Sequence, residues 1–188
     1  MSNTEASGKR VVGGGLAGGI AAWILGYLAV YLVHASEIEN SLSSNVLSAL
    51  TDENVTWKLV GWLFYNAHNV TVKIPGLLGG QSAQNFVVGA EETALTAFLV
   101  VPPLLLVAAG IAAVWNTAEE PTTAARNGAA VALGYLPLSI AGALVFAVTL
   151  GDATAAPNLV TAVLLAGTVY PLLFGAVGGL VGGHLSAE

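Results

Sequence analysis

The residues from Val11 to Val33 carry no charged side chain. An α-helix rises about 1.5 Å per residue, so this run reaches roughly 35 Å, enough to cross the apolar core of a bilayer with some tilt. Three further runs of similar length and apolarity follow at 93–115, 128–150 and 159–185. The sequence therefore predicts an all-α integral membrane protein with four transmembrane helices.

Composition agrees with a membrane protein and excludes other classes. Only 9% of the residues are charged, whereas soluble domains average about 25%. The absence of cysteine excludes disulfides, thiolate metal sites and a cysteine nucleophile. A formal net charge of -6 repels nucleic acid, so no nucleic-acid partner is expected. Scarce lysine and frequent acidic residues favour a salt-adapted source.

The first apolar run has an alternative interpretation as a secretory signal peptide. The tripeptide Val33-His34-Ala35 resembles a small-residue cleavage site. The apolar core of a signal peptide is usually only about 7–15 residues long. The length of the run from Val11 to Val33 therefore favours a retained first span.

The longest segment outside the predicted spans is 34–92, which we expect to form a small, mainly helical extracellular insertion between helices 1 and 2. Apolar residues recur at intervals of four within 36–50, a pattern typical of an amphipathic helix. A short aromatic helix follows. The alternation in Val70–Ile74 predicts a strand, which we expect to pair with Asn85–Val88.

Basic residues indicate the orientation. Lys9, Arg10 and Arg126 lie in short polar segments on one side of the predicted bundle, and the opposite turn, 151–158, contains no basic residue. Since short cytoplasmic loops are enriched in lysine and arginine, we expect a multi-pass cell-membrane protein with both termini in the cytoplasm. The cytoplasmic segments are then 1–10, 116–127 and 186–188, and the extracellular ones are 34–92 and 151–158.

The aromatic residues of the insertion allow two interpretations. Tryptophan and tyrosine favour the membrane–water interface, so the first interpretation is purely structural, an interfacial helix that packs on the bundle. The alternative is a ligand groove between this helix and the mouth of the bundle. The residues concerned are Trp57, Trp62, Phe64 and Tyr65, with Tyr65, Asn66 and His68 as the polar contacts of a groove.

The run WKLVGWLFYNAHNV, residues 57–70, resembles a segment of uncharacterised haloarchaeal multi-pass membrane proteins, some of which are labelled as transporters. The resemblance covers this run and the general four-span layout. It implies an archaeal, halophilic source, and it assigns no role to any residue.

Two sequence motifs match the acceptor pattern for N-glycosylation, Asn54-Val55-Thr56 and Asn69-Val70-Thr71. Both lie in the segment that the basic residues place outside the cell. Asn54 and Asn69 are therefore candidate glycosylation sites.

Glycine and proline give the clearest signals within the spans. Glycines spaced by four allow helix backbones to approach closely in lipid. We expect the glycines of the first and fourth spans to face one another, with a homodimer seam or glycine-rich composition alone as alternatives. The prolines should kink the helices that contain them. The residues are Gly14, Gly15, Gly18, Gly19, Gly175, Gly179 and Gly183, and Pro102, Pro103, Pro137 and Pro171.

The three histidines do not suggest a metal site. His34, His68 and His184 lie far apart in the sequence, so we interpret them as solvated side chains and expect no metal and no other cofactor. No Asp, Glu, Lys, Arg or His lies in the middle of a predicted span, although coupled carriers usually need a buried ionisable group. No nucleophile and base stand close in sequence, so we expect no enzyme.

These observations favour a non-enzymatic structural or accessory membrane protein. Its exported mini-domain would bind a partner or the cell envelope. The alternative is a small-solute transporter or channel subunit, with Ser139, Thr168 and Tyr170 lining a path between proline-kinked helices. The expected partners are the lipid bilayer and, in addition, another membrane protein or a second copy of this chain.

Overall fold

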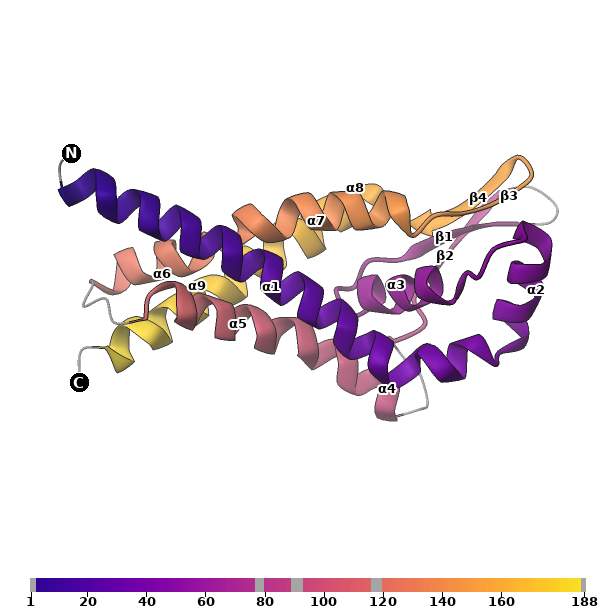
Figure 1. Ribbon diagram of the computed structural model, residues 1–188, viewed down its shortest axis with the longest axis horizontal. Helices are drawn as coiled ribbons and strands as arrows, with labels where there is room; N and C mark the ends of the chain where they lie inside the picture. Colours follow the sequence, from indigo (N-terminus) through magenta and orange to yellow (C-terminus); the bar gives the residue numbers. More distant parts are fainter. Residues whose placement is uncertain (1–2, 77–79, 89–92, 116–119, 187–188) are drawn as a thin grey trace.

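The computed structural model describes residues 3–76, 80–88, 93–115 and 120–186. Within these ranges, four helices are long and apolar enough to span a membrane. They run side by side, with both termini at one end of the molecule (Figure 1). Four apolar helices of spanning length are thus confirmed, with the bounds Val11–Glu39, Leu95–Ala113, Pro121–Val145 and Leu159–Leu185.

Three of the four spans are built from shorter helical pieces. The first is a single helix, and each of the others contains a break or a change of helix type. The elements are α1 (Asn3–Glu39), α4 (Thr93–Ala97), η1 (Phe98–Val100), α5 (Val101–Ala113), α6 (Pro121–Ala129), α7 (Ala132–Val145), α8 (Leu159–Thr161), the π-helical η2 (Ala162–Val169) and α9 (Tyr170–Leu185).

Two of the breaks lie directly before prolines. Pro102 and Pro103 begin α5 just after the 3-10 turn η1, and Pro171 begins α9 just after the π-helical η2. Proline has no amide hydrogen and its ring clashes with the preceding turn, so regular helix cannot continue through it unchanged. Pro137 lies inside α7 without a break.

A small sheet corrects the all-α prediction, because the fold is mostly helical with four antiparallel strands. The strands are β1 (Val72–Pro75), β2 (Gln81–Gln84), β3 (Val148–Leu150) and β4 (Ala153–Pro157), in the order β2-β1-β4-β3. β1 pairs with β2, so the predicted pairing with Asn85–Val88 is wrong. The side chain of Asn85 instead accepts hydrogen bonds from the backbone N–H groups of Val87 and Val88.

The third span differs from its predicted bounds, 128–150. Its helix begins earlier, at Pro121, and ends at Val145, and the last predicted residues form β3. The predicted turn 151–158 contains β4. Gly151 has a φ of 58°, which glycine adopts without strain and which closes the hairpin between β3 and β4.

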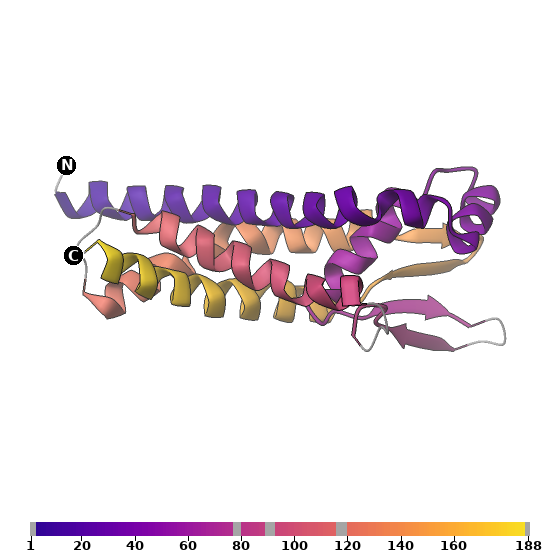
Figure 2. The same ribbon diagram turned by 90° about the horizontal axis from the view of Figure 1, so that it is seen from below.

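The end of the bundle away from the termini carries a separate group of elements, here called the distal unit. It consists of the helices α2 (Leu42–Thr51) and α3 (Thr56–Asn66) and the four strands. In Figure 2, α2 and the β1–β2 hairpin lie on opposite sides of this end. The predicted mini-domain 34–92 is therefore incomplete, because the β3–β4 hairpin, which follows the third span, contributes half of its sheet.

The short helix α3 is inserted into the mouth of the bundle. Two glycines make room for it. A Cβ on Gly26 of α1 would lie 2.9 Å from the Phe64 ring, and one on Gly61 of α3 would collide with the ring of Phe146. The missing side chains therefore leave room for the rings of Phe64 and Phe146, which allows α3 to pack beside α1 and the end of the third span.

The glycines of the first span pack against the second and third spans. A Cβ on Gly15 or Gly19 would strike the backbone of residues 130–131, where α6 meets α7. Gly18 faces Ala109 of α5, whereas a Cβ on Gly14 would meet nothing within 4 Å. Only part of this glycine run is therefore a helix contact.

The glycines of the fourth span use a different surface. Gly175 and Gly179 lie against Gly128 of α6, and Gly179 and Gly183 lie against Ala124 of the same helix. The hypothesis that the two glycine runs face one another is therefore wrong. Residues of the second and third spans separate them.

Candidate functional site

The distal unit contains an open groove of about 1100 Å³. The end of α1 and α2 form one wall, α3 forms the floor, and the sheet with residue 86 forms the other wall. The lining residues are Ile38, Ser41, Ser43, Val46, Leu47, Leu59, Trp62, Leu63, Ile74, Pro75, Gly76, Phe86, Leu150, Ala153 and Ala155.

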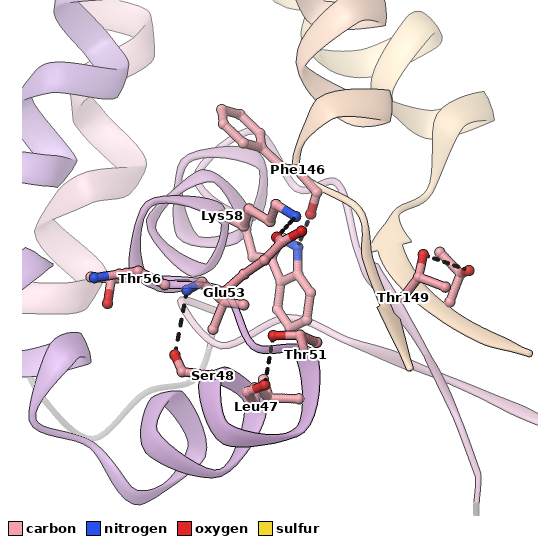
Figure 3. Close-up of polar contacts among 12 residues, drawn as sticks. Leu47, Ser48, Thr51, Glu53, Thr56, Lys58, Phe146 and Thr149 are labelled. Atoms are coloured by element: carbon pink, nitrogen blue, oxygen red, sulfur yellow. Dashed lines mark hydrogen bonds and ion pairs between the residues drawn. The ribbon is translucent and has the colours of Figure 1, made fainter. Parts of the chain in front are cut away.

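The turn between α2 and α3 is fixed by local hydrogen bonds (Figure 3). The Thr51 hydroxyl donates to the Leu47 carbonyl at 2.8 Å, and the Val55 N–H donates to the Ser48 hydroxyl at 3.4 Å. The first bond closes the last turn of α2, and the second ties α2 to the residue before α3.

Contacts with the third span hold the floor of the groove, and contacts within the sheet hold its other wall. The indole N–H of Trp62 donates to the backbone carbonyl of Phe146 at 2.8 Å, which ties the floor to the end of the third span. Thr149 and Thr154 bond across the β3–β4 hairpin at 3.2 Å, and Figure 3 shows Thr149 on its strand beside this region. The floor and walls therefore belong to different parts of the sequence.

The groove is chemically apolar. Of the described residues that line it, none is titratable. The Ser41 hydroxyl donates to the Ile38 carbonyl at 2.7 Å and accepts the Ser44 N–H at 3.1 Å, as the N-cap of α2. The Trp62 N–H likewise already donates to the Phe146 carbonyl. Among these side chains, Ser43 alone remains as a polar group for an occupant.

A second feature is a buried polar cluster where α3 ends inside the bundle. His68 is 0% exposed. Its Nδ1 lies 2.8 Å from the Phe64 carbonyl and its Nε2 lies 2.7 Å from the Tyr135 hydroxyl. A carbonyl only accepts, so Nδ1 donates, and in the neutral ring Nε2 accepts from the tyrosine. Its ring also lies against Tyr170.

Burial determines the charge of this histidine. Desolvation lowers the pKa of His68 to about 4, against the weaker opposing effect of the Phe64 carbonyl. The imidazole is therefore neutral at pH 7, which agrees with its two hydrogen bonds.

The interpretation of the histidines as solvated is wrong for two of the three. His34 and His68 are buried, and His184 is exposed. No span carries Asp, Glu, Lys, Arg or His at its centre, yet the fold brings His68, two residues after α3, against Tyr135 of the third span and Tyr170 of the fourth.

The predicted polar contacts of the groove lie elsewhere. The Tyr65 hydroxyl donates to the Ser139 carbonyl inside the bundle. The Asn66 amide donates to the Val70 carbonyl at 2.8 Å, and its oxygen accepts the Phe86 N–H at 2.9 Å. Both side chains are fully buried. Together with His68 they fix α3 in place and do not line the groove.

Most of the aromatic side chains also differ from interfacial anchors. Trp62 and Phe64 are 6% and 1% exposed, and Tyr65 is 0% exposed. Trp57 is 36% exposed, and its carbonyl accepts a hydrogen bond from Tyr27. Trp57 is thus the one member of the predicted aromatic set that can reach the membrane–water interface.

The two candidate glycosylation sites have different surroundings. Asn54 is exposed in the connector before α3, where its side-chain oxygen accepts the Thr56 N–H. Asn69 has a φ of 58°, and its amide nitrogen donates to the Tyr170 hydroxyl at 2.8 Å.

We expect glycan at Asn54 and none at Asn69, because the Asn69 amide nitrogen is already engaged with the bundle. In a host that glycosylates exported segments, Asn54→Gln should lower the mass of the purified protein by one glycan. Asn69→Gln should leave the mass unchanged apart from the substitution. Mass spectrometry of the intact protein measures both, and glycan that persists in Asn54→Gln would contradict this assignment.

Four apolar helices of spanning length, closed at one end by a short buried helix, define a multi-pass membrane protein in contact with the lipid bilayer. The chain belongs to a family of unknown function, DUF7978, which matches residues 1–186. Searches of curated proteins and of solved structures gave no match.

Proposed function

We propose that this protein is a non-enzymatic accessory membrane protein whose distal unit binds an apolar group of a partner or of the cell envelope. The observation that carries the proposal is the groove of about 1100 Å³ between α2, α3 and the sheet. Ligand sites commonly measure about 300–1000 Å³ and are mostly apolar. A groove of this size and polarity supports binding, and its described lining offers no titratable group for acid–base chemistry.

The proposal includes an orientation with the distal unit outside the cell and both termini in the cytoplasm. Lys9, Arg10 and Arg126 support it. Single cysteines at the exposed residues Ser82 and Thr122 test it with an impermeant thiol reagent on intact cells. We expect the label at Ser82 alone. Labelling at Thr122 alone would show that the distal unit lies in the cytoplasm and would contradict the orientation.

Photocrosslinking from within the groove tests the binding role. A benzophenone amino acid at Val46, which lines the groove and is 47% exposed, should form a covalent adduct in native membranes. Leu42 is the matched control, because it lies one turn away on α2, is 80% exposed and does not line the groove. Adduct at Val46 well above that at Leu42 is expected. Equal or absent adduct at the two positions would overturn the proposal.

A small-solute transporter or channel subunit is the second candidate, and the buried contact of His68 with Tyr135 and Tyr170 favours it. Other expected path residues support it less, because the hydroxyls of Ser139 and Thr168 bond to carbonyls of their own helices. Vesicles containing the protein and an internal pH dye test this candidate. A proton flux lost in His68→Gln would support it, and vesicles no leakier than protein-free ones would reject proton movement.

A further inference from the structure

We propose that the groove of the distal unit holds the acyl chain of a bilayer lipid. This inference rests on the proposed binding function and names the class of ligand. Three properties of the groove support it: a lining with Ser43 as its one uncommitted polar side chain, the position at the ends of the spans, and the exposed apolar rim.

The side chains of the groove favour hydrocarbon over peptide. A bound peptide carries backbone N–H and C=O groups, and each costs free energy when it is buried without a partner. The Ser41 hydroxyl and the Trp62 N–H already donate to the Ile38 and Phe146 carbonyls, so they cannot donate to a peptide. An acyl chain needs no hydrogen bond, and the described lining offers it only one uncommitted polar side chain, that of Ser43.

The position of the groove indicates the bilayer as the source of the chain. Ile38 lines the groove and lies within the first candidate span, which ends at Glu39. The floor residue Trp62 is bonded to Phe146, the residue after the third candidate span. The groove therefore begins where two membrane-spanning helices end, beside the apolar phase of the membrane.

The rim of the groove is open and apolar. Val46 and Phe86 line it and are 47% and 41% exposed, although both are apolar. Exposed apolar surface of this kind marks a contact with lipid or protein. A lipid chain that enters from the bilayer would cover the side chains of Val46 and Phe86.

Photoreactive lipid tests the inference on the whole protein in lipid nanodiscs. The probe is a phosphatidylcholine with a diazirine at the end of one acyl chain, and the labelled residues are mapped by mass spectrometry. We expect label on groove residues such as Leu59 and Leu63. Leu32 of α1, which is 82% exposed, serves as the internal reference for ordinary contact with lipid.

Two substitutions fill the groove, Val46→Trp at its half-exposed wall and Ala153→Trp on β4. Each should reduce the groove label at least fivefold relative to the label at Leu32, and the matched control Leu42→Trp should not. The use of two variants guards against a folding defect in either one.

Label at Leu32 without label in the groove would overturn the lipid inference. If the Val46 photocrosslink then proved to be a protein, the binding function would stand and the occupant would be a protein segment. If neither experiment gave a groove-specific adduct, the binding function would fail as well.

Discussion

Replacing Gly179 with leucine is expected to lower the free energy of unfolding of the purified protein by about 3 kcal/mol, the upper part of the range for overpacking a tight contact. A Cβ at this position would overlap the Ala124 carbonyl and lie 3.0 Å from the Cα of Gly128. Both are backbone atoms of α6, so the two helices must separate. Equilibrium unfolding in mild detergent measures the change.

The first span supplies an adjacent pair of glycines as a control. Gly15→Leu should destabilise the protein, because its Cβ would lie 2.6 Å from that of Ala130, whereas Gly14→Leu should not, since nothing lies within 4 Å. Gly15 and Gly179 have no neighbour in common among those contacts, so the two losses should add to within about 0.5 kcal/mol. A stable Gly179→Leu protein, or equal effects at Gly14 and Gly15, would contradict the packing described above.

Acidification is expected to destabilise the wild-type protein through His68, by roughly 3 kcal/mol between pH 6.5 and pH 4. Burial lowers the pKa of this histidine from 6.5 to about 4, so the unfolded chain takes up a proton in this range that the folded protein does not. The contribution is therefore fully present above pH 6.5 and is lost as the pH falls toward 4. Unfolding curves at several pH values measure it.

His68→Gln separates this contribution from that of the carboxylates, which also titrate as the pH falls. Glutamine keeps a polar group near the Phe64 carbonyl and the Tyr135 hydroxyl but does not titrate. The wild-type protein should lose more stability than this variant over the same range. Parallel pH profiles for the two proteins would show that His68 is not buried as the structure places it.

Local properties of the sequence predict the four spans. A helix that crosses a bilayer must be long and apolar, and both properties can be read from an uncharged run such as Val11–Val33. The break before Pro102 follows equally directly, because proline lacks the amide hydrogen that the preceding turn needs. The β3 strand was missed because Val148–Leu150 is also apolar enough to extend a helix.

The candidate site was predicted only in part. One of the two interpretations was a ligand groove between the aromatic helix and the mouth of the bundle. The groove in the structure lies instead between α2, α3 and the sheet, and Trp62 alone of the predicted residues lines it. Nothing local distinguishes Trp62 from Tyr65, since both lie in the same helix and are buried. Which of them faces the groove depends on the orientation of α3 against the third span.

The sequence alone thus determined the membrane class, the number of apolar helices and the breaks at Pro102 and Pro171, because each depends on residues close together in the chain. It did not reveal that α7 continues unbroken through Pro137. Only the tertiary structure decided the burial of His68, the partners of the glycines and the groove itself. The bond of Trp62 to Phe146 and the pairing of β1 with β4 join residues more than 80 positions apart. Such contacts form only when the spans are packed, so no local pattern in the chain specifies them.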